Sequence, residues 1–97
     1  MLRHVVLLRF KDSTSKEAIS EITESLHELA PQISTVRSFS VNVDLGLADG
    51  NAQMIIMAEF DNQAGYEFYR DHPEHKKVIA EQIADQLAER AAAQYAF

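Results

Sequence analysis

The sequence predicts an α+β fold in which a four-stranded antiparallel sheet carries its helices on one face. First, apolar runs typical of strands occupy residues 2–10, 34–45 and 52–60, with a shorter run at 92–97. Second, residues 15–30 and 61–90 show the apolar spacings of three and four that are typical of helices. Third, the first strand is apolar on both faces, so both faces are expected to be covered.

The first strand is predicted for Leu2–Phe10, "LRHVVLLRF". Side chains alternate between the two faces of a strand. The even positions share one face: His4, Val6, Leu8 and Phe10. The odd positions share the other: Val5, Leu7 and Arg9. One layer of helices covers only one face of a sheet, so we expect the second face to pack against a second copy of the chain.

The first helix is predicted from about Ser15 to Ala30. Thr14 and Glu17 have the spacing of a capping box, in which a hydroxyl and a carboxylate bond the first free amides of a helix. Apolar residues follow at spacings of three and four: Ile19, Ile22, Leu26, Leu29 and Ile33. Pro31 then marks the end of the helix.

The next two strands are predicted to form a hairpin. Residues 34–45 alternate between apolar and polar, with one face formed by Phe39, Val41, Val43 and Leu45. Gly46–Gly50 contains an Asp-Gly pair, which is a turn signal. Residues 52–60 follow as the third strand, with one face formed by Met54, Ile56, Ala58 and Phe60.

The second helical region is predicted to be split at His72. Asp61 or Asn62 can cap a helix that continues to about Asp71. Pro73 suits the first turn of a helix and disfavours the helical conformation in the residue before it. A fresh helix is therefore expected from Pro73 to about Arg90, and residues 92–97 form the fourth strand. The inward row of that helix is Ile79, Ile83 and Leu87.

The resulting order of elements, β-α-β-β-α-β, is that of the ferredoxin-like fold. A chain of 97 residues is expected to form one domain, spanning residues 1–97. The absence of cysteine excludes disulfides, thiol nucleophiles and cysteine zinc sites, and fits a reducing cytoplasm. A net charge of −6 with scattered basic residues argues against nucleic acid as a partner. No stretch is long enough to span a membrane, so we expect a cytoplasmic protein.

The stretch Tyr69–His75, "YRDHPEH", holds the candidate chemistry. With Pro73 in the first helical position, His72 is the N-cap and His75 is the third residue of the helix. The positive field of a helix N-terminus disfavours an imidazolium, so a neutral His75 could serve as a general base. Tyr69 could donate a hydrogen bond to a carbonyl oxygen that becomes an enolate. His4 lies on the face of the first strand that carries Val6 and Leu8, and it enters the same space if that face meets the helices.

The hypothesis is therefore a pocket between sheet and helices, with Tyr69, His75 and His4 as catalytic residues, for a small carbonyl, apolar or phenolic ligand. The residues expected to bind the ligand are Val6, Leu8, Ile22, Leu26, Ile56, His72 and Val78. The alternative is that the tyrosine and histidines serve only to pack and cap a helix joint. A metal site made of His72, His75 and the neighbouring carboxylates of Asp71 and Glu74 is a second alternative. Zinc requires three or four ligands that share one site, so we expect neither a metal nor a cofactor.

These residues resemble the stress-responsive A/B barrel (Dabb) family. The resemblance covers nearly the whole chain and rests on "HVVLLRFKD", on "MAEFDNQAGYEFYRDHPEH" and, most specifically, on the pattern Tyr69-x-x-His72-Pro73-x-His75. It implies a homodimer in which two four-stranded sheets face each other and close a barrel, with the helices outside.

The resemblance also implies candidate functions. Most members have no assigned biochemical role, and one plant member is a cofactor-free polyketide cyclase. Its catalytic tyrosine and histidine correspond to Tyr69 and His75, and a further histidine corresponds to His4. A second histidine of that enzyme corresponds to about Met54 here, and its pocket aromatics correspond to Ile22 and its neighbours. Three functions remain open: a stable dimer with a vestigial pocket, a cofactor-free lyase, cyclase or isomerase, and a monooxygenase-like barrel.

Overall fold

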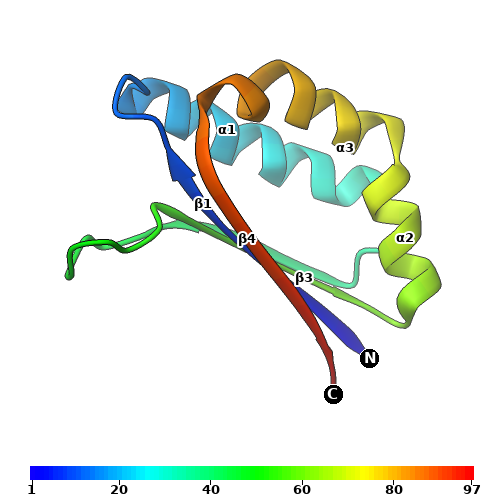
Figure 1. Ribbon diagram of the computed structural model, residues 1–97. Coiled ribbons are helices and arrows are strands. Elements are labelled where there is room, and N and C mark those ends of the chain that lie inside the picture. Colours follow the sequence, from blue (N-terminus) through cyan, green and yellow to red (C-terminus); the bar gives the residue numbers. More distant parts are fainter.

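The computed structural model describes residues 1–97 and consists of a twisted antiparallel sheet with helices on one face (Figure 1). The strands are β1 Leu2–Phe10, β2 Ser38–Val43, β3 Met54–Phe60 and β4 Leu87–Ala96. The helices are α1 Lys16–Leu29, α2 Gln63–Asp71 and α3 Pro73–Val78. The strands lie in the order β2-β3-β1-β4. The ferredoxin-like arrangement that the sequence predicts is therefore confirmed, with β1 and β3 at the centre of the sheet.

The inner face of the sheet, which is the face toward the helices, forms the core. Every even position of β1 from His4 to Phe10 is buried, and so is every even position of β3. The helices contribute Ile22, Leu26 and Leu29 from α1, and Tyr69 from α2. The faces predicted for the first and third strands are thus confirmed, because each strand buries its apolar row against α1 and α2.

The outer face of the sheet has no helix over it (Figure 1). In the centre of this face, Val5 pairs with Met57, and Leu7 pairs with Ile55. On the other side of β1, the same two residues pair with Ala93 and Ala91. Val5, Leu7, Ile55, Met57, Ala91 and Ala93 therefore form one apolar stripe, which we call the outer stripe.

The start of α1 differs by one residue from the prediction. The N-cap is Ser15, whose hydroxyl accepts a hydrogen bond from the amide of Ala18. The hydroxyl of Thr14 instead donates a hydrogen bond of 2.9 Å to the side chain of Gln86. A long-range partner therefore removes Thr14 from its predicted role as the cap. Ile33 lies beyond the helix, after the 3₁₀ turn Ala30–Gln32, and is buried in the core.

The predicted apolar face of β2 is only partly buried. Val41 is buried and Phe39 is partly buried, but Val43 at the end of the strand is 54% exposed, and Leu45 lies outside the strand and is 84% exposed. The strand ends at Val43 because β3, its only partner, begins at Met54 in register with that residue. The connection between the two strands extends beyond the sheet (Figure 1).

The end of the second helical region also differs from the prediction. Helix α3 gives way to a π-helical turn, Ile79–Ile83, and a 3₁₀ turn, Ala84–Gln86. Strand β4 then begins at Leu87, so the helix stops well before Arg90 and the strand starts before residue 92. The predicted break at His72 is confirmed, with the backbone of this residue extended between α2 and α3.

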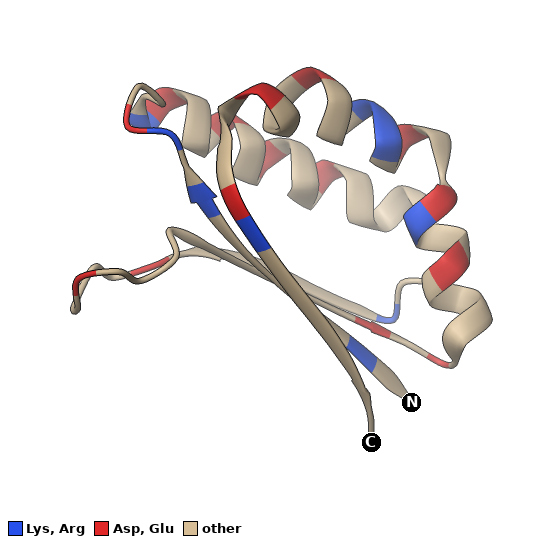
Figure 2. Cartoon of the chain, in the orientation of Figure 1, with Lys and Arg blue, Asp and Glu red and all other residues tan.

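Charged residues lie mainly on the surface, and the basic ones are scattered between the acidic ones (Figure 2). Three ion pairs occur, namely Arg3–Glu59, Arg37–Asp61 and Arg70–Asp71. None of the helices combines the length and the apolar composition that a membrane crossing requires.

Candidate functional site

A cavity of about 270 Å³ lies between the inner face of the sheet and the helices. Seven of the residues predicted for the site line it: His4, Val6, Leu8, Leu26, Ile56, Tyr69 and His75. The other lining residues are Tyr66, Arg70, Ile79, Ile83, Ala84, Leu87 and Arg90. A larger and more open hollow, of about 690 Å³, lies beside the β2–β3 connection, but neither a histidine nor a tyrosine lines it.

His4 forms one wall of the cavity from the centre of β1. It is 5% exposed, and the side-chain amide of Gln94 on β4 donates a hydrogen bond of 2.8 Å to its Nδ1. The proton of the neutral ring is therefore on Nε2. Burial lowers the pKa of His4 to about 4, and the electrostatic influence of the neighbouring Arg90 and His75 acts in the same direction. Near neutral pH, His4 is an uncharged hydrogen-bond donor.

Tyr69 enters the cavity from α2 and is 2% exposed. Its ring lies 6.2 Å from that of His4 and 4.2 Å from that of His75, measured between centroids. Its hydroxyl forms no hydrogen bond within the chain, yet no polar side-chain atom is both fully buried and without a partner. The hydroxyl therefore reaches the open space of the cavity. Burial raises the pKa of Tyr69 to about 12, so the group remains a phenol that can donate.

His75 lies in the first turn of α3, where Pro73 and the His72 cap orient the helix. Its Nδ1 is 3.1 Å from the carbonyl oxygen of Arg70. Because a carbonyl can only accept, Nδ1 donates this bond, and the lone pair of the neutral ring is on Nε2. Burial lowers the pKa of His75, the neighbouring His72 and Arg90 act in the same direction, and the hydrogen bond to the carbonyl of Arg70 opposes the shift. The ring is a neutral base at neutral pH.

Three residues predicted for the site do not line the cavity. Ile22 is buried on α1 and belongs to the core between this helix and the inner face of the sheet. His72 caps α3 through a hydrogen bond of 3.1 Å from the amide of Glu74 to its Nδ1. Val78 packs against the edge of the core on the side of α3 that faces α1.

The helical turns after α3 supply much of the apolar lining. In the π-helical turn the amide of Ala84 bonds the carbonyl of Ile79, five residues earlier, so these two residues lie above one another. Ile79, Ile83 and Leu87, which the sequence predicts as an inward row, all line the cavity. The spacing of four between these three residues therefore predicted a shared apolar surface, although Leu87 is the first residue of β4 and not part of a helix.

Tyr66 and Arg90 are lining residues that sequence reasoning missed. The ring of Tyr66 lies 4.9 Å from that of His4, measured between centroids, and its position one turn before Tyr69 was an available signal. Arg90 was assigned to the end of a helix, so its place beside the cavity on β4 had no signal in the periodicity.

The side chains near Tyr69–His75 do not converge on a metal site. No three His, Asp or Glu side chains in the structure are placed together as metal ligands would be. Asp71 instead holds Arg70 in an ion pair of 2.9 Å, and His72 bonds its own helix. The polar groups that face the cavity are suited to donate hydrogen bonds and to accept a proton.

Comparisons with known proteins agree with this architecture. The family model of the stress responsive A/B barrel domain (Dabb) matches residues 2–97. A stress-response A/B barrel domain-containing protein of Arabidopsis thaliana is 34% identical over 81 residues, which cover 80% of this chain and 70% of the relative. A dimeric ferredoxin-like protein of unknown function from Thermobifida fusca is 33% identical, with a TM-score of 0.91 and coverage of 99% and 90% of the two chains.

A hydroxynitrile lyase from Passiflora edulis has the same fold, with a TM-score of 0.83, coverage of 97% of this chain and 90% of the lyase, and 17% identity. At that identity the likeness concerns the fold alone. The family model spans nearly the whole sequence, and the two relatives that are more than 30% identical agree with it. The chain therefore belongs to the stress-responsive A/B barrel family.

Proposed function

We propose that this protein binds a small carbonyl compound in the cavity and catalyses a cofactor-free acid–base reaction of the lyase, cyclase or isomerase class. One observation carries the proposal. The ring of His75, a neutral histidine with a free Nε2, lies tilted beside a buried tyrosine whose hydroxyl has no partner in the chain, with 4.2 Å between the ring centroids. Such a pair supplies both a base and a hydrogen-bond donor within one cavity.

The size of the cavity supports a small substrate. Ligand pockets for drug-sized molecules usually have volumes of about 300–1,000 Å³, and a cavity of about 150 Å³ is enough for benzene. A volume of about 270 Å³ thus suits one ring with a short substituent. The apolar residues Ile79, Ile83 and Leu87 of the lining would bury that ring, and His75 lies one helical turn before Ile79.

The proposed step is the removal of a proton next to a carbonyl. Nε2 of His75 takes the proton from the carbon, and the electron pair of the broken C–H bond forms the C=C bond of an enolate. The negative charge that develops on the carbonyl oxygen accepts a hydrogen bond from the hydroxyl of Tyr69, and His4 can donate a second one from Nε2. The resulting imidazolium returns its proton to a different carbon of the enolate system, which gives an isomer. Where the enolate carbon first attacks a second carbonyl of the same substrate, a C–C bond forms as the π electron pair of that carbonyl moves onto its oxygen, and the imidazolium protonates the alkoxide, which gives a cyclised product.

The fold is compatible with this class, because a hydroxynitrile lyase shares it. That enzyme is too distant in sequence for its substrate to be carried over. The role of the cavity in this chain therefore depends on its own residues, and a direct test is required.

The test is the exchange of substrate protons with solvent. Acetophenone and 4-hydroxyacetophenone are incubated with the protein in D₂O at neutral pH, and proton NMR follows the loss of their methyl signal. We expect the wild-type protein to accelerate the exchange and His75→Gln to abolish most of the acceleration, by about 10²–10⁴-fold for a general base. The Tyr69→Phe variant should exchange the substrate protons more slowly than the wild type and should still bind the ketones.

His27→Gln is the matched control, because His27 is exposed on α1 and does not line the cavity. This variant should exchange protons at the wild-type rate. Equal exchange rates in wild-type protein and His75→Gln would rule out His75 as the general base. Binding of the ketones with no exchange above buffer would leave a ligand-binding protein, and an absence of both would leave a structural helix joint.

We also infer that the chain forms a homodimer through the outer face of the sheet. The outer stripe is apolar, and no element of the chain covers it. An apolar stripe at the centre of a sheet face is expected to be buried by a partner. The relative from Thermobifida fusca, which is 33% identical, is dimeric, and this supports the inference.

A further inference from the structure

The cavity has an unusual charge for a protein whose net charge is −6. No aspartate or glutamate lines it. Two arginines do, and Arg70 is already paired with Asp71, its two nitrogens reaching the two carboxylate oxygens at 2.9 Å. Arg90 takes part in none of the three ion pairs of the chain. Its guanidinium is the one unpaired permanent charge on the cavity wall.

A local irregularity of β4 directs Arg90 toward the cavity. Leu8 on β1 pairs with Arg90 on β4, and Phe10 pairs with Leu87. Leu8 and Phe10 are two residues apart, so a regular ladder would also place their partners two residues apart, but Leu87 and Arg90 are three apart. The register shift between Arg9 and Phe10 leaves one extra residue, Ala88, on β4. Because of this bulge, Leu87 and Arg90 lie on the same inner face and both line the cavity. A regular strand would place them on opposite faces.

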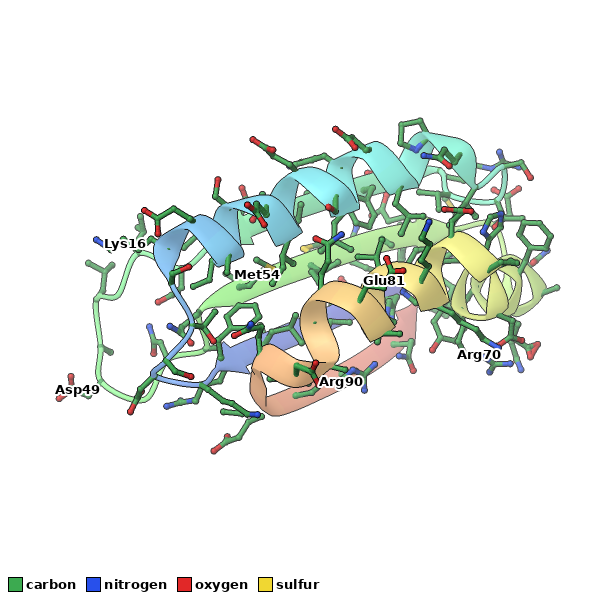
Figure 3. All side chains as sticks on the ribbon, turned by 90° about the horizontal axis from the view of Figure 1, so that it is seen from above. Lys16, Asp49, Met54, Arg70, Glu81 and Arg90 are labelled. Atoms are coloured by element: carbon green, nitrogen blue, oxygen red, sulfur yellow. The ribbon has the colours of Figure 1, made fainter.

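Arg90 lies at the mouth of the cavity, because it is solvent-exposed and also part of the lining. Seen from above the helices, it lies along β4, whereas Arg70 is at the far end on α2 (Figure 3). The largest influence on the pKa of each inner group is burial, which lowers the pKa of His4 and of His75 and raises that of Tyr69. The charge of Arg90 also reaches the interior, because it lowers the pKa of all three groups. Both histidines are neutral, so they add no positive charge of their own at neutral pH.

We propose that Arg90 selects an anionic ligand, namely a small, mostly apolar molecule that carries one carboxylate. The apolar body enters between Ile79, Ile83 and Leu8, and the carboxylate remains at the mouth, where the planar guanidinium can bind both of its oxygens. This inference deepens the proposed function, because it assigns the charge of the ligand at the same site. The neutral hydrogen-bond donors inside would then face the part of the ligand that reacts.

The experiment compares three probes of nearly equal shape and different charge: benzoate, benzamide and benzamidinium. Their affinities are measured by titration of the ¹⁵N-labelled full-length protein in heteronuclear NMR. We expect benzoate to bind roughly tenfold more tightly than benzamide, a modest preference because Arg90 is exposed, and benzamidinium to bind least. Added salt should weaken the binding of benzoate and leave the affinity for benzamide unchanged, because salt screens the ion pair between the carboxylate and Arg90 at the mouth.

Two variants assign the preference to one side chain. Arg90→Gln should bind benzoate and benzamide equally well, and the exposed position makes a folded variant the expected result, which circular dichroism verifies. Lys16→Gln removes the same charge from the start of α1, which does not line the cavity, and should keep the wild-type preference. The proposal is overturned if wild-type protein does not distinguish benzoate from benzamide, if Arg90→Gln keeps the preference, or if benzoate does not bind at millimolar concentration.

The result also separates this inference from the catalytic proposal. Benzoate binding that depends on Arg90, combined with no proton exchange in any ketone, would leave the charge selectivity intact and reject catalysis by His75. Exchange that depends on His75, combined with an Arg90→Gln variant that keeps its preference for benzoate, would reject the selectivity and leave catalysis intact.

Discussion

His4 is the only buried polar or charged residue of the structure, and its environment stabilises the neutral form. The pKa of His4 is about 4 in the folded chain, whereas an unperturbed histidine in the unfolded chain has a pKa of 6.5. Between pH 4 and pH 6.5 the unfolded chain therefore binds a proton at His4 that the folded chain does not bind. The stabilising contribution is therefore complete above pH 6.5 and is lost as the pH falls toward 4. At 1.36 kcal/mol per pKa unit, the loss is about 3 kcal/mol.

We predict that replacement of His4 by glutamine removes this part of the pH dependence. The free energy of unfolding, measured by urea denaturation at intervals between pH 7 and 4, should decrease less in His4→Gln than in wild type, by about 3 kcal/mol over the range. The comparison concerns the change with pH, so a constant offset from the substitution does not affect it. His27→Gln should keep the wild-type slope, and an unchanged slope in His4→Gln would contradict the prediction.

At the scale of elements, sequence reasoning succeeded where a local pattern determines the structure. The two-residue period of a strand groups the residues of β1 and β3 into the two faces that the structure shows, and Pro73 fixes the break between α2 and α3. It failed where a distant partner decides, as at Thr14, which bonds Gln86 and leaves the cap to Ser15. The end of α3 and the bulge at Ala88 likewise depend on pairing with β1, which no spacing within residues 79–90 reveals.

The candidate site divides along the same line. Tyr69 and His75 are six residues apart on either side of the break at His72, and His4 follows from the face of β1, so sequence could place all three near one space. Arg90 reaches the cavity only through the bulge, and His72 is withdrawn from it because its Nδ1 accepts from the amide of Glu74. Local capping thus removed one predicted residue, and tertiary pairing added one that was not predicted.

The beginning of α2 permits a prediction about backbone freedom. A Cβ on Gly65 would lie 3.5 Å from the Cβ atoms of Phe60 and Thr35, which is ordinary van der Waals contact. Because alanine has the higher helix propensity and restricts the unfolded chain, Gly65→Ala should raise the free energy of unfolding by roughly 0.5–1 kcal/mol. Urea denaturation at neutral pH measures the change.

Gly50→Ala provides the contrast, because Gly50 has φ of +84° in the β2–β3 connection. Nothing lies within 4 Å of a Cβ built at this position, so any cost comes from the backbone conformation alone. The same chemical change should here lower the free energy of unfolding by about 1–2 kcal/mol. A Gly65→Ala variant that is destabilised as much as Gly50→Ala would mean that the contacts with Phe60 and Thr35 are tighter than their distances indicate.

At the scale of the whole molecule, the two faces of the sheet have separate tasks. The inner face carries His4 and the cavity, and the outer face carries the outer stripe, through which we infer that the dimer forms. Both sets of residues alternate along the same strands, since His4 and Val6 point inward while Val5 and Leu7 point outward. A change on the outer face should therefore alter assembly without rebuilding the cavity, because none of the outer-stripe residues lines the cavity.

Leu7→Lys tests this separation. Leu7 is 39% exposed in the single chain and lies in the outer stripe, so a lysine there is tolerated in a monomer but places two like charges in or near a two-fold interface. We expect light scattering at micromolar concentration to give twice the mass of one chain for the wild type and the mass of one chain for Leu7→Lys. Leu47→Lys is the matched control, since Leu47 is 84% exposed in the β2–β3 connection. A wild-type protein with the mass of one chain would reject the dimer, and a monomeric Leu7→Lys variant that retains benzoate binding would show that each chain holds a complete cavity.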